Sequence, residues 1–158
     1  FVLRAREKGI IFDVGFGGAS FRYPIGAPAT RAGFYPDVIS TDLHVNSMNS
    51  AMKDMPNIMS IFLALGMSLP DVIKASTWNP ARCIKREDLG HLSAGAVADV
   101  TIFSLREGDF GFLVIGGEIK GTKRIENEIT IRGGQVVYNL NGRINPISLP
   151  MAQNQRGR

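Results

Sequence analysis

The clearest structural signal in the chain is the run Pro36-Asp37-Val38-Ile39-Ser40-Thr41-Asp42-Leu43-His44. A short β-branched segment rises out of a turn and delivers a carboxylate, Asp42, and an imidazole, His44, where a strand should end. In parallel α/β folds, catalytic groups collect at the carboxyl ends of the strands. A carboxylate two residues from a histidine suits a divalent-metal site or proton transfer.

A second apolar run lies upstream, at Gly9-Ile10-Ile11-Phe12-Asp13-Val14-Gly15. Its composition predicts a strand buried on both faces. Residues 20–32 predict a short helix that Gly33 closes, although Pro24 and Pro28 limit its regularity. Strand, helix and strand in this order imply a parallel pair joined by a right-handed crossover.

The middle of the chain predicts helices. Residues 54–66 are apolar on nearly all sides, so this helix must be buried or covered by another layer. Ser68-Leu69-Pro70-Asp71 has the spacing of a capping box and predicts a second helix, which stops before Asn79-Pro80.

From about residue 85 the pattern changes to short strands. Residues 98–103 predict one strand, and the segments on either side of Gly133-Gly134 predict a hairpin with a two-residue turn. We therefore expect an α/β portion over 1–84, a β portion over 85–146 and a disordered tail over 147–158.

The composition narrows the class of protein. With 158 residues, 44% of them hydrophobic, the chain has material for one ordinary domain. Phe1 is not an initiator methionine, and Arg4 to Gly9 is typical of the end of a helix. We therefore expect the C-terminal portion of a longer polypeptide.

The charge pattern argues against nucleic acid as a partner. The net charge is +4, but the basic residues are scattered and lack interleaved aromatic residues, which favours a solvated surface. The single cysteine, Cys83, allows no internal disulfide and indicates a reducing compartment. No stretch approaches the ~18 apolar residues of a membrane span. We expect a cytoplasmic protein with a small-molecule substrate, and homo-oligomerisation stays open.

Taken in order, these motifs resemble the C-terminal part of the amidohydrolase superfamily of metal-dependent hydrolases. The resemblance is strongest to the amidohydrolase/deacetylase branch, which is similar to dihydroorotases, and it extends to about Pro146. It implies strands seven and eight of a (β/α)₈ TIM barrel, followed by part of a small β-sandwich. The matching stretches are Ile11–Gly15, Gly17–Phe21, Pro36–His44, Met52–Met67, Asn79–Arg82, Gly90–Leu92, Gly95, Ala98–Val100 and Arg132–Val137.

The resemblance also assigns roles to residues. Asp42 matches an aspartate that ligates a metal and acts as the general base on a metal-activated water; from the residues alone, a helix N-cap is an equal reading. His44 would orient Asp42 or touch substrate, or be a loop histidine with a local hydrogen bond. The substrate pocket is implied to include Phe16, Gly17 and Ser20.

Phe16 departs from the family pattern, which typically has histidine at this position. Phenylalanine can neither coordinate a metal nor donate a hydrogen bond. A substrate with an apolar group, an inactive variant and a sequence error all remain open explanations.

The implied reaction is hydrolysis of a C–N bond (amide or cyclic amide) or of an acetyl ester, with one or two divalent metals, Zn²⁺ foremost. The family site also needs a His-x-His pair, a bridging carboxylated lysine or acid, and further histidines from strands that this sequence lacks. A catalytic zinc normally takes at least three protein ligands, so we expect this chain alone to be inactive. The alternative, which Phe16 favours, is a non-catalytic amidohydrolase-like scaffold or oligomerisation protein.

Overall fold

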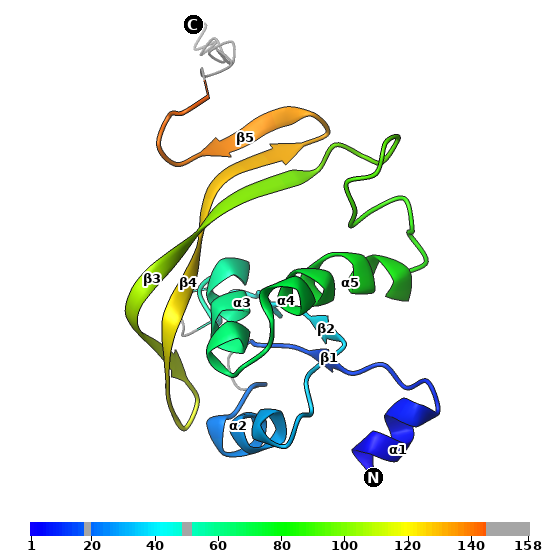
Figure 1. Cartoon of the computed structure of the whole chain (residues 1–158), viewed down its shortest axis with the longest axis vertical. Coiled ribbons are helices and arrows are strands. Elements are labelled where there is room, and N and C mark those ends of the chain that lie inside the picture. Colours follow the sequence, from blue (N-terminus) through cyan, green and yellow to red (C-terminus); the bar gives the residue numbers. More distant parts are fainter. Residues whose placement is uncertain (18–19, 49–51, 145–158) are drawn as a thin grey trace, which may run out of the picture.

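The computed structural model describes residues 1–17, 20–48 and 52–144 of the chain. Helices and strands occur in mixed order, so the α/β class predicted from the sequence is confirmed. Figure 1 shows the N-terminal helix near one end of the molecule and a long curved sheet along one side, with helices between them. The tail predicted over 147–158 lies outside the described residues.

The first two strands form a parallel pair. β1 (Asp13–Val14) lies beside β2 (Val38–Ile39), and helix α2 (Tyr23–Arg31) connects them. Pro28 lies inside α2 without ending it, and Gly33 follows the helix with a φ of +80°. The predicted order of strand, helix and parallel strand is therefore present.

The prediction of a strand buried on both faces is wrong for the run before Gly15. The paired part of β1 is two residues long, Ile10 and Ile11 are 54% and 56% exposed, and Asp13 is also exposed. Among the described residues, β1 has β2 as its one neighbouring strand, so one edge stays open. The predicted helix end is present: α1 (Val2–Glu7) stops just before Gly9, whose φ is +83°.

Three helices follow in the middle of the chain. α3 (Met55–Ala64) begins at Asp54, whose carboxylate accepts a hydrogen bond from the Asn57 amide at 2.8 Å. α4 (Leu69–Ser76) is capped by Ser68, as its sequence predicts. α5 (Trp78–Cys83) is a single short turn beyond it. α3 and α4 thus begin where a polar side chain caps them, whereas α5 has no such cap.

The β portion is a three-stranded antiparallel sheet. Its order is β3 (Val100–Val114), β4 (Gly117–Arg132), β5 (Gln135–Asn139). The turn between β4 and β5 is Gly133-Gly134, both with positive φ, so the predicted hairpin is confirmed. Positive φ at both turn residues is the requirement that glycine meets without strain.

The long β3–β4 hairpin was not predicted from the sequence. β3 has 15 residues and β4 has 16, whereas the sequence indicated a strand over 98–103 and a short strand just before Gly133. The pairing shifts by extra residues at Ile102/Phe103 and at Glu107/Phe110, so two bulges bend the ribbon. Figure 1 shows this ribbon curving past the helices.

A shared core joins α3 to β4. Ile58, Ile61 and Phe62 of α3 are at most 1% exposed, so the prediction that this apolar helix must be covered is confirmed. Ser60, fully buried beside them, accepts a hydrogen bond from the Ile125 amide at 2.8 Å and donates to the Pro56 carbonyl at 2.6 Å. One hydroxyl therefore ties the helix to the sheet.

The predicted boundary near residue 85 and the second sheet of the sandwich stay predictions. The described residues supply one antiparallel sheet in the β portion. Within that same part of the chain, no helix combines the length and hydrophobicity that crossing a membrane requires.

Candidate functional site

The candidate site is built around Asp42, which follows β2. Its backbone is left-handed, with a φ of +53°, a conformation that costs a residue other than glycine free energy. Its side chain is half exposed, with 50% of its surface accessible. Such a conformation persists only where the surrounding structure holds it.

Two neighbours hold the Asp42 backbone. The Ser47 side chain is fully buried, and its Oγ lies 3.2 Å from the Asp42 carbonyl oxygen. The same Oγ accepts a hydrogen bond from the His44 amide at 2.9 Å. His44 closes the turn from the other side, because its Nδ1 lies 2.8 Å from the Asp42 carbonyl oxygen. Residues 42–47 therefore form a compact turn with Asp42 at its start.

The contact of His44 fixes its tautomer. A carbonyl oxygen only accepts hydrogen bonds, so Nδ1 must carry the proton in this contact. In the neutral imidazole, Nε2 then carries the lone pair, which can accept a proton or bind a metal. The Nδ1 atom also lies 4.0 Å from Oδ1 of Asp42. The turn thus holds the two side chains close together, with the protonated nitrogen of His44 facing the carboxylate.

The loop after β1 completes the setting of the carboxylate. Ser20 donates its hydroxyl to Oδ2 of Asp42 at 3.0 Å, and its amide donates to the Gly17 carbonyl at 3.1 Å. A Cβ at Gly17 would lie 2.3 Å from Oδ2 and 2.8 Å from the Asp42 carbonyl oxygen. A Cβ at Gly15 would meet the Asp42 Cβ at 3.4 Å, an ordinary contact. The lack of a side chain at Gly17 therefore makes room for the carboxylate.

The structure brings together four of the five residues singled out from the sequence, Asp42, His44, Gly17 and Ser20. The fifth, Phe16, turns its ring into the core, where it is 4% exposed. The ring stacks on Phe21 with centroids 4.8 Å apart and planes at 14°. The roles of these residues toward a substrate or a metal stay predictions.

Three residues near the site were missed at the level of sequence. Ser40 places its Oγ 2.9 Å from both carboxylate oxygens of Asp13, across the strand pair. Asp13 alternates with Gly15, and Ser40 alternates with Asp42, so a period of two would have placed all four on one face. The buried Ser47 could have been found as a hydroxyl closing a local turn three residues after His44.

The residue types at this site are ones that bind divalent metals, but there are too few of them to hold an ion. Hydrolytic metals take carboxylate oxygen and imidazole nitrogen, which Asp42 and His44 supply. Among the described residues, however, no group of three or more histidine, cysteine, aspartate or glutamate side chains could hold an ion. This site therefore offers part of a coordination shell, and the remaining ligands would have to come from elsewhere.

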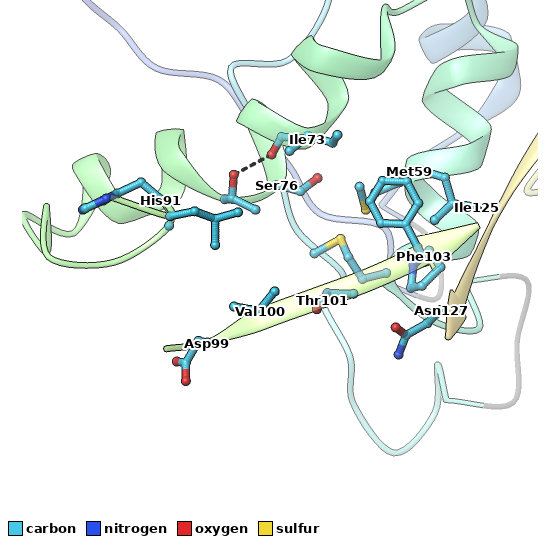
Figure 2. Close-up of a pocket in the computed structure, with 15 residues that line it drawn as sticks. Met59, Ile73, Ser76, His91, Asp99, Val100, Thr101, Phe103, Ile125 and Asn127 are labelled. Atoms are coloured by element: carbon cyan, nitrogen blue, oxygen red, sulfur yellow. Dashed lines mark hydrogen bonds between the residues drawn. The ribbon is translucent and has the colours of Figure 1, made fainter. Parts of the chain in front are cut away.

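A separate cavity of about 720 Å³ lies between the helices and the sheet, and residues of the Asp42 site do not line it. Its walls are mostly apolar, from Met59 and Ile73 on the helices to Phe103 and Ile125 on the strands (Figure 2). His91 lies at one end of the cavity, edge-on to the Trp78 ring with centroids 5.5 Å apart. This cavity offers a packing surface rather than a cluster of reactive groups.

The chain is similar to known proteins over most of its length. The profile of the Amidohydrolase family matches residues 27–137. A deacetylase of Brucella anthropi is 37% identical over 135 residues, which make up 85% of this chain and 34% of the relative. The chain thus spans about a third of the length of the curated relatives it matches.

Solved structures give the same picture. An adenine deaminase superposes with a TM-score of 0.81 at 29% identity, and a dihydroorotase with a TM-score of 0.78 at 32% identity. Each likeness covers 87% of this chain and 38% of the other chain.

Proposed function

Because this chain belongs to the amidohydrolase family, as its motifs predicted, we propose that it is the C-terminal part of a metal-dependent hydrolase. The bond cleaved would be a C–N bond, amide or cyclic amide, or an acetyl ester. The similar proteins support this range, since they are a deacetylase, an adenine deaminase and a dihydroorotase. The proposed partner is a small molecule in the cytoplasm, neither nucleic acid nor membrane.

The observation that carries the proposal is the setting of the Asp42 carboxylate. It stands at the carboxyl end of β2 on a strained backbone, with Oδ2 held by Ser20. Strained backbone held by its surroundings is typical of functional sites. We propose that Asp42 is a metal ligand and the general base, taking a proton at a carboxylate oxygen and passing it to the leaving group.

A bound divalent metal, Zn²⁺ foremost, would supply Lewis acidity and lower the pKa of water to about 7. The residues of this chain would position the carboxylate and leave space for it. Ser20 and the Asp42–His44 turn fix where the carboxylate lies, and Gly17 leaves space in front of it. The lone pair on Nε2 of His44 is then available for a hydrogen bond to substrate.

The proposal is tested on the longer protein that would contain this chain, by measuring bound metal and turnover of N-acetyl, cyclic amide and acetyl ester substrates. We expect one or two divalent metals per chain. Asp42→Asn should lower kcat by about 10²–10⁴-fold, because the general base is lost. Asp109→Asn, which changes an exposed carboxylate of β3, is the matched control and should leave kcat unchanged.

The same measurements decide the alternative. A chain without bound metal and without turnover of any of these substrates would support a non-catalytic scaffold or oligomerisation protein. Residues 1–158 alone should be inactive, because the described part supplies too few ligands for a catalytic metal. Full activity of Asp42→Asn would contradict the proposed role of this residue.

A further inference from the structure

We infer that Phe16 is a positioning residue, whose buried ring holds Gly17 and Ser20 against the Asp42 carboxylate. The catalytic consequence rests on the proposed function of Asp42, whereas the positioning itself does not. The ring is 4% exposed and stacks on Phe21, and the Phe21 ring meets that of Phe62 edge-on with centroids 5.9 Å apart. Phe62, in α3, is 1% exposed. Position 16 is thus fastened to the central core.

The residues on either side of Phe16 face the opposite way. The positions where Gly15 and Gly17 would carry a Cβ lie 3.4 Å and 2.3 Å from the nearest atoms of Asp42. The ring of Phe16 thus lies in the core, whereas the Cβ positions of both neighbours face Asp42. The Gly15-Phe16-Gly17 segment is therefore anchored on one side and forms the seat of Asp42 on the other.

The anchor reaches the carboxylate through two hydrogen bonds. The Gly17 carbonyl accepts from the Ser20 amide at 3.1 Å, and the Ser20 hydroxyl donates to Oδ2 of Asp42 at 3.0 Å. A shift of Gly17 would carry the Ser20 donor with it. The ring of Phe16 thereby fixes both the space and the donor that Asp42 uses.

This arrangement indicates that phenylalanine at position 16 supports the site and does not contact substrate. A side chain that contacts substrate would have to reach the open face where Asp42 and His44 lie, and this ring does not. Phenylalanine here strengthens the support of the site instead of removing a reactive group. The two readings predict opposite results when histidine is placed at this position.

The test without activity is amide hydrogen exchange across residues 38–48. Phe16→Leu, which removes the ring stack, should speed exchange of the Ser40, His44 and Ser47 amides about tenfold. Ser20→Ala should also speed exchange of these amides. In a protein that already carries Phe16→Leu it should add little, because both substitutions act on the same chain of contacts to Asp42. Phe34→Leu is the control, since the Phe34 ring packs edge-on against Phe12, with ring centroids 5.1 Å apart, and not against Phe16 or Phe21. Its effect and that of Ser20→Ala should add.

Unchanged exchange over 38–48 in Phe16→Leu, or additivity of Phe16→Leu with Ser20→Ala, would overturn the inference. If Phe16→Leu does not fold, Phe21→Leu replaces it and should give the same pattern, because Phe21 carries the stack. In the active protein, Phe16→His should lower kcat about 10–100-fold with KM unchanged. A rise in turnover, or a change in KM alone, would mean that position 16 meets substrate. Absence of turnover in the unaltered protein would reject the proposed function and leave the exchange result decisive.

Discussion

Asp42 and Glu128 are two carboxylates in contrasting surroundings. Glu128, in β4, is 8% exposed, and both its oxygens accept hydrogen bonds, one from Asn141 at 2.8 Å and one from Ser104 at 3.2 Å. Asp42 is half exposed, and among the described residues its carboxylate accepts a hydrogen bond at Oδ2 alone. A carboxylate with both oxygens satisfied supports the fold, whereas one with an oxygen left over can bind a ligand.

The backbones of the two regions differ as well: the backbone is regular around Glu128 and strained at Asp42. Glu128 lies in a continuous strand, at the bulge where β4 carries one more residue than β3. Asp42 lies outside any strand, on a left-handed backbone. Regular structure stabilises the first region, and the second region accepts strain in order to present one group.

Among the variants that compare these two regions, Gly17→Ala should produce the largest effect, and it should fall on activity. The backbone of Gly17 does not require glycine, but the new Cβ would lie 2.3 Å from Oδ2 of Asp42, so the carboxylate must move. A displacement of about 1 Å can cost about 10²-fold in kcat. Gly15→Ala is the matched control, because its Cβ would meet Asp42 at 3.4 Å. The kcat values of both variants are measured by steady-state kinetics. Equal values would mean that the space at Gly17 does not determine the position of the Asp42 carboxylate.

Ser60→Ala should lower stability and leave the site intact. It removes the acceptor of the buried Ile125 amide, which then has no partner. An unsatisfied buried donor costs about 1–3 kcal/mol of the free energy of unfolding. Ser76→Ala is the control, since its hydroxyl donates to the Val72 carbonyl of its own helix. Urea denaturation separates the two, and a Ser76→Ala loss as large as that of Ser60→Ala would contradict the proposed link between helix and sheet.

Acid should weaken the region around Glu128. The hydrogen bond from Asn141, followed by that from Ser104, holds the pKa of the Glu128 carboxyl below its ordinary value, although burial opposes this. A lowered pKa in the folded state means that the stabilisation is fully present above the ordinary glutamate pKa of about 4.3 and is lost as the pH falls through the folded value. Melting temperatures between pH 3 and pH 6 should therefore fall less steeply in Glu128→Gln than in the unaltered protein. Identical slopes would show that this carboxylate is not held as described.

Ser20→Ala should give the smallest effect on stability. The hydroxyl serves a half-exposed carboxylate, where water can replace the lost bond, so the cost should stay within about 0.5 kcal/mol. Its effect should appear instead as a few-fold loss of kcat, because the carboxylate is less well oriented. Denaturation and kinetics on one preparation test this, and a stability loss like that of Ser60→Ala would mean that Ser20 belongs to the fold rather than to the site.

Local signals in the sequence predicted much of the fold. Ser68 and Asp54 mark the starts of two helices because their side chains satisfy amides that a helix leaves unpaired. Gly133-Gly134 marks the turn of a hairpin. The grouping of Asp42 and His44 could be read from the strand before them.

The errors concern information that is not local. Ile10 and Ile11 look like a buried strand, but burial depends on which segments pack on them, and the described residues supply no such cover. The β3–β4 hairpin was missed because Arg106-Glu107-Gly108-Asp109 interrupts the alternation at a bulge. The direction of the Phe16 ring could not be predicted, since alternation separates two faces without saying which is the core.

The hydrogen bond between Ser60 and Ile125 has a consequence for motion. Ile125 pairs with Leu105, and the two bulges of the ribbon lie on either side of this rung, at Ile102/Phe103 and at Glu107/Phe110. Bulges are where a ribbon bends. The rung held by α3 therefore acts as a fixed point. The tip of the hairpin is fixed as well, because the Ile115 carbonyl accepts a hydrogen bond from the Tyr23 amide at 2.9 Å and the Phe112 side chain is buried in the core. Bending of the ribbon is therefore expected at the Ile102/Phe103 bulge, on the side of the fixed rung that carries β5.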